Sequence, residues 1–178
     1  MCMCLILWML VYGVKLNTVS CCHESDKSLL LMFKEGVVDP SNRLSSWSTL
    51  QDCCKWRGVS CDDNNRVDGL VLSDYKSISE PLSGEINLSS LLSLQFLEML
   101  GLDYNDFERI SMPSINNSVA APHHGHLLSN SSSKLSTSLY VLSLSYNIHL
   151  HIDSFCHLLS LLPSLEYLDL NGIKLPSE

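Results

Sequence analysis

The amino-acid sequence predicts an α/β solenoid: a right-handed coil with a short parallel β-sheet on its concave face, preceded by a disulfide-bonded helical cap. Three observations predict this fold class. Leucines recur at fixed spacing in the second half of the chain, cysteines cluster near its start, and one short apolar run opens the sequence. With 178 residues, 46% of them apolar, the chain is long enough to bury a core of its own.

The leucine spacing follows the template LxxLxxLxLxxNxF, which is the pattern of leucine-rich repeats. The unit from Leu94 to Phe107 fills every position of the template. Two later units fill most positions, at Leu139, Leu142, Leu144 and Asn147, and at Leu162, Leu165, Leu168 and Leu170, with Ile173 in place of asparagine. An imperfect unit at Val67, Leu70 and Leu72 comes first, with a predicted turn at residues 82–86. We therefore predict about four repeats over residues 63–178.

One segment interrupts the repeats. Leu100 and Leu142 occupy the same template position but lie much further apart than one repeat length. Between them, residues 113–138 lack the leucine template and have the composition of a loop, rich in serine, asparagine and histidine. This pattern predicts an irregular insertion at 113–138.

Each LxL pair should form a short strand whose leucines point inward while the residues between them point outward. The template asparagines, Asn105 and Asn147, should bond free backbone groups where the chain turns away, and so serve the scaffold. The outward positions are the binding candidates on the concave face. They are Met99, Gly101, Asp103, Tyr104, Val141, Ser143, Ser145, Tyr146, Tyr167, Asp169 and Asn171.

The amino-terminal run Leu5–Val14 has the length of a signal-peptide apolar core and is followed by polar residues. We therefore predict a signal peptide over residues 1–21 and entry into the secretory pathway, with the product extracellular, in the apoplast, or at the cell surface. No second run reaches the ~20 apolar residues that a membrane span requires.

The cysteines of an exported chain are better explained by disulfides than by catalytic thiols. Cys53 and Cys54 are adjacent, and a bond between them would close a strained ring, so each should have a separate partner. We expect Cys22–Cys53 and Cys54–Cys61, with Cys21–Cys53 as an alternative pairing. Cys21 and Cys156 would then be unpaired or engaged with a partner. A zinc site is disfavoured because the C-x2-C spacing is absent.

A short helix should lie between these cysteines. Ser25 or Asp26 can cap it, Gly36 can end it, and a turn follows at residues 39–42. Its apolar face would be Leu29, Leu30, Met32 and Phe33, and the cap core Leu44, Trp47, Trp56 and Val59. Packing explains Trp56 better than a role as a ligand platform. The cap is thus expected to span residues 22–62.

Cap and repeats together resemble the plant leucine-rich-repeat receptor-like proteins and receptor kinases. The resemblance is carried by CHESDKSLLLMFKEGVVDP at 22–40, LSSW at 44–47, DCCKWRGVSCD at 52–62 and LSLQFLEMLGLDYNDF at 92–107. It implies a concave face that binds a peptide, a protein or a co-receptor ectodomain, in defence or developmental signalling. It also implies that the full-length relative is membrane-anchored, although this chain contains no membrane span.

Two alternatives stay open at this point. The secreted inhibitors of cell-wall-degrading enzymes share the cap and lack an anchor, although they are expected to carry about ten regular repeats. A non-functional truncated product is the other alternative, because the chain stops at Glu178 without a capping cysteine pair.

Several function classes are not supported by the sequence. The formal charge of −8 and the lack of a basic stripe disfavour nucleic acid as a partner. We find no nucleophile elbow, phosphate-binding loop, kinase signature or HExxH pair, and therefore predict neither catalytic residues nor a cofactor. The histidines His123, His124, His126, His149 and His151 are better explained by a solvated loop than by a metal site. Sequons at Asn87, Asn116 and Asn130 predict at least one glycan.

Overall fold

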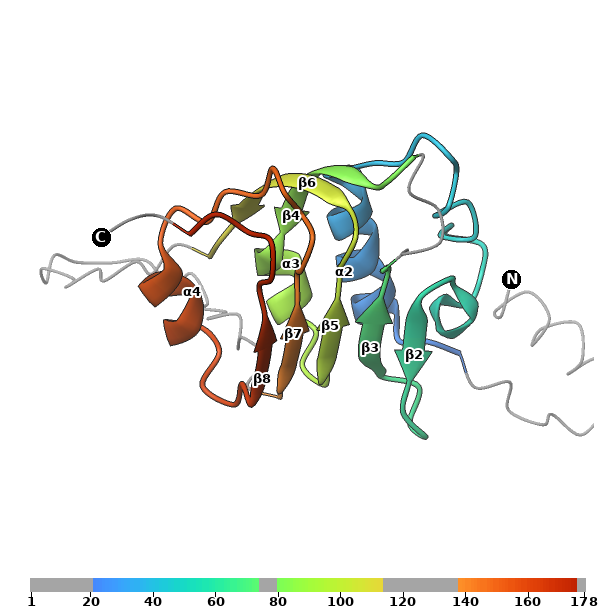
Figure 1. Ribbon diagram of the computed structural model, residues 1–178. Helices are drawn as coiled ribbons and strands as arrows, with labels where there is room; N and C mark the ends of the chain where they lie inside the picture. Colours follow the sequence, from blue (N-terminus) through green and yellow to red (C-terminus); the bar gives the residue numbers. More distant parts are fainter. Residues whose placement is uncertain (1–20, 74–79, 114–137, 176–178) are drawn as a thin grey trace, which may run out of the picture.

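The structure is a computed structural model that describes residues 21–73, 80–113 and 138–175. Within these residues the strands form two sheets, drawn in Figure 1. The larger sheet has the order β2-β3-β5-β7-β8 and the smaller one the order β1-β4-β6. The predicted signal peptide and most of the predicted insertion lie outside the described residues.

The larger sheet holds the repeats. Its strands are β2 (Val59–Cys61), β3 (Val67–Val71), β5 (Met99–Gly101), β7 (Val141–Ser143) and β8 (Tyr167–Asp169). From β3 to β8 neighbouring strands are parallel, and Leu70, Leu100, Leu142 and Leu168 stand in register across them. β5 pairs directly with β7 despite the long chain segment between them. The template therefore predicts the register correctly.

The sheet is mixed, however, which corrects the prediction of a parallel one. β2 runs antiparallel to β3, since a short turn joins the two strands. Asn65 occupies a left-handed conformation in that turn, and its N–H donates to the carbonyl of Asp62 at 2.9 Å. The strand that belongs to the cap thus covers one edge of the repeat sheet.

The smaller sheet consists of β1 (Val37–Val38), β4 (Ser83–Asn87) and β6 (Asp106–Ser111). β4 pairs antiparallel with β1 and parallel with β6. Residues 83–86 are therefore strand and not the predicted turn, because both neighbours supply partners for their backbone groups. Gly84 makes the close approach possible: its φ is +94°, and a Cβ there would lie 2.5 Å from the Gly36 carbonyl oxygen.

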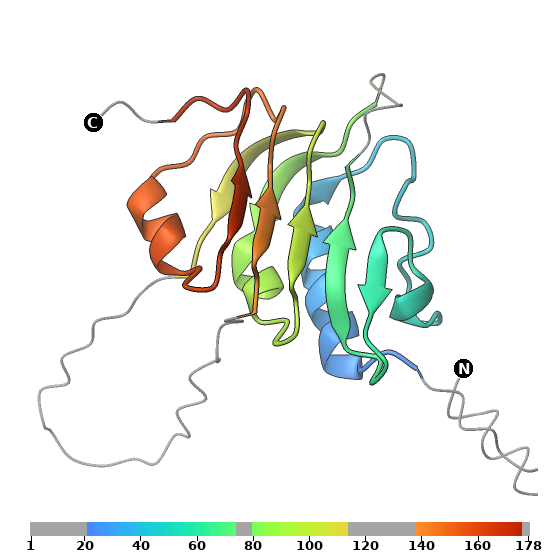
Figure 2. The ribbon, with the colours of Figure 1, turned by 60° about the horizontal axis from the view of Figure 1, so that its bottom comes forward.

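The described residues form three α-helices beside the larger sheet. Two of them lie behind it, and the last lies at the end of the sheet where β8 runs (Figure 2). They are α2 (Glu24–Glu35), α3 (Leu88–Leu92) and α4 (Phe155–Ser160). Asn87 caps α3 by accepting a hydrogen bond from the Ser90 N–H, and Ser154 caps α4 in the same way from His157. Leucine side chains from strands and helices fill the space between the layers, including Leu30, Leu70, Leu91, Leu100 and Leu142.

Helix α2 begins at Glu24, two residues earlier than the nearer of the two predicted caps, Ser25, would allow. His23 is the N-cap and makes no side-chain capping bond, so the prediction of Ser25 or Asp26 as cap is wrong. Asp26 instead faces inward, where its carboxylate accepts from Arg66 at 2.9 and 3.0 Å and from the Val67 N–H at 3.1 Å. The helix ends at Gly36 as expected, but Met32 is exposed rather than part of the apolar face.

Aromatic packing and hydrogen bonds hold the cap together. Trp47 and Trp56 stack with ring centroids 5.2 Å apart, and both are buried, which confirms packing as the role of Trp56. The Lys34 ammonium donates to the carbonyls of Leu44 and Trp47 at 3.0 and 2.9 Å. The helix is thereby tied to the loop that follows it, and Leu44 is buried as predicted.

An exposed sheet face and a disulfide-bonded cap

The outward side chains of the larger sheet form three rows that run across its parallel strands. Because side chains alternate along a strand, every second residue points away from the leucine core. The first row is Gly69, Met99, Val141 and Tyr167, and the second row is Val71, Gly101, Ser143 and Asp169. The third row lies two residues beyond the second and is Ser73, Asp103, Ser145 and Asn171.

The first two rows present apolar side chains to solvent. Met99 is 39% exposed, Val71 45% and Tyr167 55%. Val141 and Ser143 are half-buried, and Gly101 leaves a gap in the second row between Val71 and Ser143. This pattern of large and small outward side chains can accept a partner by shape as well as by polarity.

The third row is a hydrogen-bonded ladder centred on Asp103. The Asp103 carboxylate accepts from the Ser73 hydroxyl at 2.7 Å and from the Ser145 N–H and hydroxyl at 3.0 and 2.9 Å. The hydroxyl of Ser143, in the second row, also donates to it. Ser145 is consequently buried, so its place among the exposed binding candidates is corrected.

The remaining polar candidates, Asp169 and Asn171, bond to each other on the last repeat. The Asp169 carboxylate accepts from the N–H of Asn171 at 3.0 Å and from its side-chain amide at 2.6 Å. Asp103 and Asp169 form no ion pair with a basic side chain in the described part of the chain. Both carboxylates therefore contribute uncompensated negative charge to the face.

Two tyrosines lie in the loops that follow β5 and β7. The Tyr104 and Tyr146 rings stack with centroids 4.5 Å apart and planes 12° apart, and the two side chains are 41% and 49% exposed. The pKa of Tyr104 is raised, first by partial removal of its hydroxyl from water, then by Tyr146, and further by the charges of Asp103 and Asp169. The repeat template places both tyrosines among the candidates but does not reveal that they stack.

Buried asparagines hold these loops in place. The Asn105 amide donates to the carbonyls of Leu72, Leu102 and Asp103 at 3.0 to 3.2 Å. The Asn147 amide donates to Leu102 and Leu144 at 2.9 and 2.7 Å and accepts from the Phe107 N–H at 3.2 Å. The predicted scaffold role of both residues is confirmed. Sequence reasoning missed Arg43, which donates to the Asn105 side chain at 3.0 Å, because no local pattern links residues so far apart.

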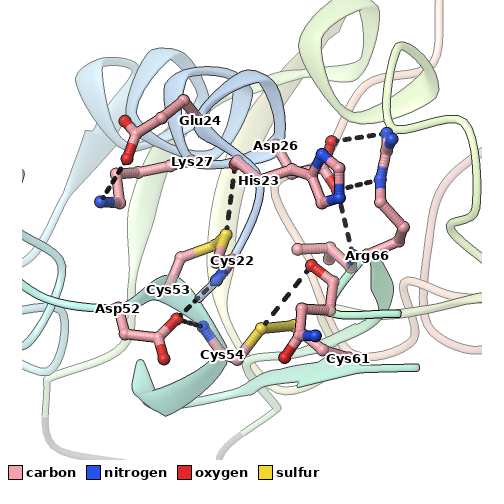
Figure 3. Close-up of a disulfide and its surroundings, with 12 residues drawn as sticks. Cys22, His23, Glu24, Asp26, Lys27, Asp52, Cys53, Cys54, Cys61 and Arg66 are labelled. Carbon is pink, nitrogen blue, oxygen red and sulfur yellow. Dashed lines mark hydrogen bonds and ion pairs between the residues drawn. A yellow bond between two sulfur atoms is a disulfide. The ribbon is translucent and has the colours of Figure 1, made fainter. Parts of the chain in front are cut away.

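The cap contains two disulfides, shown in Figure 3. They join Cys22 to Cys53 and Cys54 to Cys61, with Cα atoms 5.4 and 5.6 Å apart, and these are the pairs that we expected. Cys21 is also disulfide-bonded and is not a free thiol, whereas Cys156 is free and exposed on α4.

Asp52 lies between the two disulfides. Its carboxylate accepts from the N–H groups of Cys22 and Cys54 at 2.9 and 3.2 Å (Figure 3). Cys22, Asp52 and Cys54 bring potential metal ligands close together. Both sulfurs are consumed in disulfides, however, and so provide no thiolate for a metal.

Two of the candidate histidines, His149 and His151, are described, and they lie together on another part of the surface. His149 pairs with Asp106 at 2.5 Å, and both line a shallow cavity of about 370 Å³ with Glu108, Arg109 and His151. These groups do not converge on one point as metal ligands would. His123, His124 and His126 lie outside the described residues.

Of the three sequons, the structure describes one. The Asn87 side chain is half-buried, because it caps α3 by accepting from the Ser90 N–H at 3.1 Å. Asn116 and Asn130 lie outside the described residues. None of the described helices has the length and apolar character needed to cross a membrane.

Comparison with known proteins gives a consistent picture. Residues 23–62 match the leucine-rich-repeat N-terminal domain. The receptor-like protein EIX2 of Solanum lycopersicum is 34% identical over 101 residues, which are 52% of this chain and 10% of that protein. The chain thus spans about a tenth of the length of that curated relative.

Two solved structures from Arabidopsis thaliana have the same fold. A chain of the BIR3–SERK2 complex is 32% identical with a TM-score of 0.58, and the match covers 83% of this chain and 68% of that one. The ectodomain of the receptor kinase HAESA, solved with an extended IDA peptide hormone ligand, is 29% identical with a TM-score of 0.57, covering 84% of this chain and 21% of that one. The chain therefore belongs to the plant leucine-rich-repeat receptor-like proteins and receptor kinases.

Proposed function

We propose that this chain is an extracellular, partner-binding segment of a plant cell-surface receptor-like protein. The observation that carries the proposal is the exposed face of the larger sheet, where Met99, Val71 and Tyr167 present apolar surface beside two uncompensated carboxylates. Exposed apolar side chains arranged on a rigid sheet are typical of a recognition surface. The serine hydroxyls of the third row and of Ser143 donate to Asp103, and the three rows contain no histidine that could act as their base, so binding explains the face better than catalysis.

The partners in this proposal are a peptide, a protein or a co-receptor ectodomain. Two features of related structures support them: HAESA was solved with a peptide hormone, and the BIR3–SERK2 structure is a complex of two proteins. We further propose that the repeats wind as a right-handed coil, with the three rows on its concave side. The cap would cover the amino-terminal edge of that coil, and signalling in defence or development would be the wider role.

Photocrosslinking tests where a partner binds. The full chain, secreted by plant cells, is prepared with benzoylphenylalanine in place of Tyr167 on the exposed face. A matched chain carries the same group in place of Met32, which is 49% exposed on α2 and lies away from the sheet face. After irradiation in apoplastic fluid, mass spectrometry identifies each adduct.

The proposal expects an adduct with a secreted peptide or a receptor ectodomain from the Tyr167 position and none from the Met32 position. It also expects unlabelled chain to compete with the adduct, and a Met99→Arg variant to compete at least tenfold less well. Adducts from the Met32 position alone would contradict the proposal. An adduct with a cell-wall-degrading enzyme would instead favour the inhibitor function.

A further inference from the structure

The two stacked tyrosines occupy the same position in two successive repeats, and the next repeat has this position as well. Tyr104 precedes Asn105 and Tyr146 precedes Asn147, and both tyrosines have left-handed backbones with φ of 55° and 58°. The backbone ladder joins these loops, since the Tyr104 N–H donates to Ser145 at 3.0 Å and the Tyr146 N–H to Asn171 at 2.7 Å. Because the loops are parallel and in register, their side chains at this position lie next to one another, and the two tyrosine rings stack.

The third repeat has glycine at that position. Gly172 has φ of +79°, the same left-handed region as the two tyrosines, and a Cβ on it would lie 3.7 Å from the Cδ1 atom of Tyr146. A side chain at residue 172 would therefore rest against the Tyr146 ring. Glycine adds no side chain there, and Tyr146 is 49% exposed, so the aromatic stack ends in an open face.

The electrostatic surroundings of the stack favour a cation. Asp103 and Asp169 both act on Tyr104 through their charge, and neither has a basic partner among the described residues. The three rows contain no lysine or arginine. An aromatic ring also presents a negative face, so ring and carboxylates attract positive charge together. An anionic polysaccharide would be repelled.

We propose that the Tyr104–Tyr146 stack binds a basic side chain of a peptide or protein partner, which lies against the open face of Tyr146 beside Gly172. Arginine fits best, because its planar guanidinium can lie flat on a ring while its N–H groups reach a carboxylate such as Asp169. The inference rests on the proposed function and adds the chemistry of one anchor residue in the partner. The stack supplies the π surface and the two aspartates supply the charge.

Two blocked tripeptides test the proposal, acetyl-Gly-Arg-Gly-amide and the same peptide with neutral citrulline in place of arginine. The full chain is labelled with ¹³C in its tyrosine rings, and the ring signals are followed by NMR as each peptide is added. We expect the arginine peptide to shift the Tyr104 and Tyr146 signals and to bind about three- to fivefold more tightly than the citrulline peptide. Added salt should reduce this difference.

Matched variants locate the binding. Gly172→Asn places an amide against the open ring face and keeps the left-handed backbone, which asparagine tolerates, so arginine binding should fall about fivefold. Tyr146→Phe keeps the ring and should bind within about twofold of the original chain, whereas Tyr146→Leu should lose the arginine preference. Tyr140→Leu is the control, because Tyr140 is 37% exposed just before β7, at the opposite end of that strand.

Equal binding of the two tripeptides would overturn the proposal, as would unchanged binding in Gly172→Asn. Cellotetraose, a neutral sugar that can also stack on tyrosine, is titrated in parallel. If it shifts the two ring signals while the arginine peptide does not, the stack is a sugar site instead. These results leave the broader function intact if Tyr167 crosslinks to a partner, so failure of the two proposals can be told apart.

Discussion

Asn147 shows how much of this fold depends on a single side chain. It is completely buried, and its amide satisfies two carbonyls and one N–H of loops that belong to neighbouring repeats. A buried backbone group without a partner costs about 1–3 kcal/mol. The asparagine position of the repeat template is therefore needed for a set of hydrogen bonds between two repeats.

We expect Asn147→Ala to lower the free energy of unfolding by about 2–4 kcal/mol, because it leaves the Leu144 carbonyl and the Phe107 N–H unpaired. Asn171→Ala is the matched control, since Asn171 is exposed and, among the residues that the structure describes, its side chain bonds only to Asp169. The control should change stability by less than about 0.5 kcal/mol. Urea unfolding without reductant measures both, and equal losses would refute the scaffold role of Asn147.

Tyr104 should make stability sensitive to alkaline pH. Its pKa is raised in the folded chain, mainly because its hydroxyl is partly removed from water. The unfolded chain therefore loses this proton first as the pH rises past about 10, and folding stability falls from there until the folded pKa is passed.

Tyr104→Phe should make the fall in stability above pH 10 shallower than it is in the original chain. Tyr140→Phe, at another exposed tyrosine, is the matched control and should leave the fall as it is. Thermal unfolding between pH 8 and 11 checks this prediction. Identical pH profiles for the two variants would show that Tyr104 does not contribute to the alkaline loss.

Among the secondary-structure elements, the strands of the repeats can be predicted from the sequence, whereas the smaller sheet cannot. Leu100 and Leu142 identify β5 and β7 because one repeat pattern recurs in both, and register follows from the pattern. β4 has no such signal: its glycine and serine are typical of a turn, and only pairing with β1 and β6 makes it a strand. Asp26 was misplaced as a cap for the same reason, because its partner Arg66 is distant in sequence.

Gly84 tests that account of the smaller sheet. Gly84→Ala should lower the free energy of unfolding by roughly 2–3 kcal/mol, since φ is +94° and the new methyl would meet the Gly36 carbonyl at 2.5 Å. Gly101→Ala is a matched control in the other sheet, where the nearest atom to a new Cβ is 3.4 Å away. It should cost less than about 1 kcal/mol. Comparable losses, measured by denaturant unfolding, would mean that Gly84 is not strained.

For the whole molecule, export is the property on which the proposed function depends. We expect the full chain, expressed in plant cells, to reach the medium without roughly its first 20 residues and to carry glycan on Asn116 or Asn130. Amino-terminal sequencing and a glycosidase-induced mobility shift measure the two features. A cytosolic product that retains Met1 and shows no shift would contradict both.

The position of the two disulfides also bears on how the chain folds as it is synthesised. Both lie between residues 22 and 61, so every sulfur they require has been made before any of the leucine strands from β3 onward. Because domains fold from the amino terminus as they emerge, the cap can be oxidised while the repeats are still being translated. Each later repeat then adds to a finished edge, so in an exported chain oxidising conditions would matter most in the first moments after translocation.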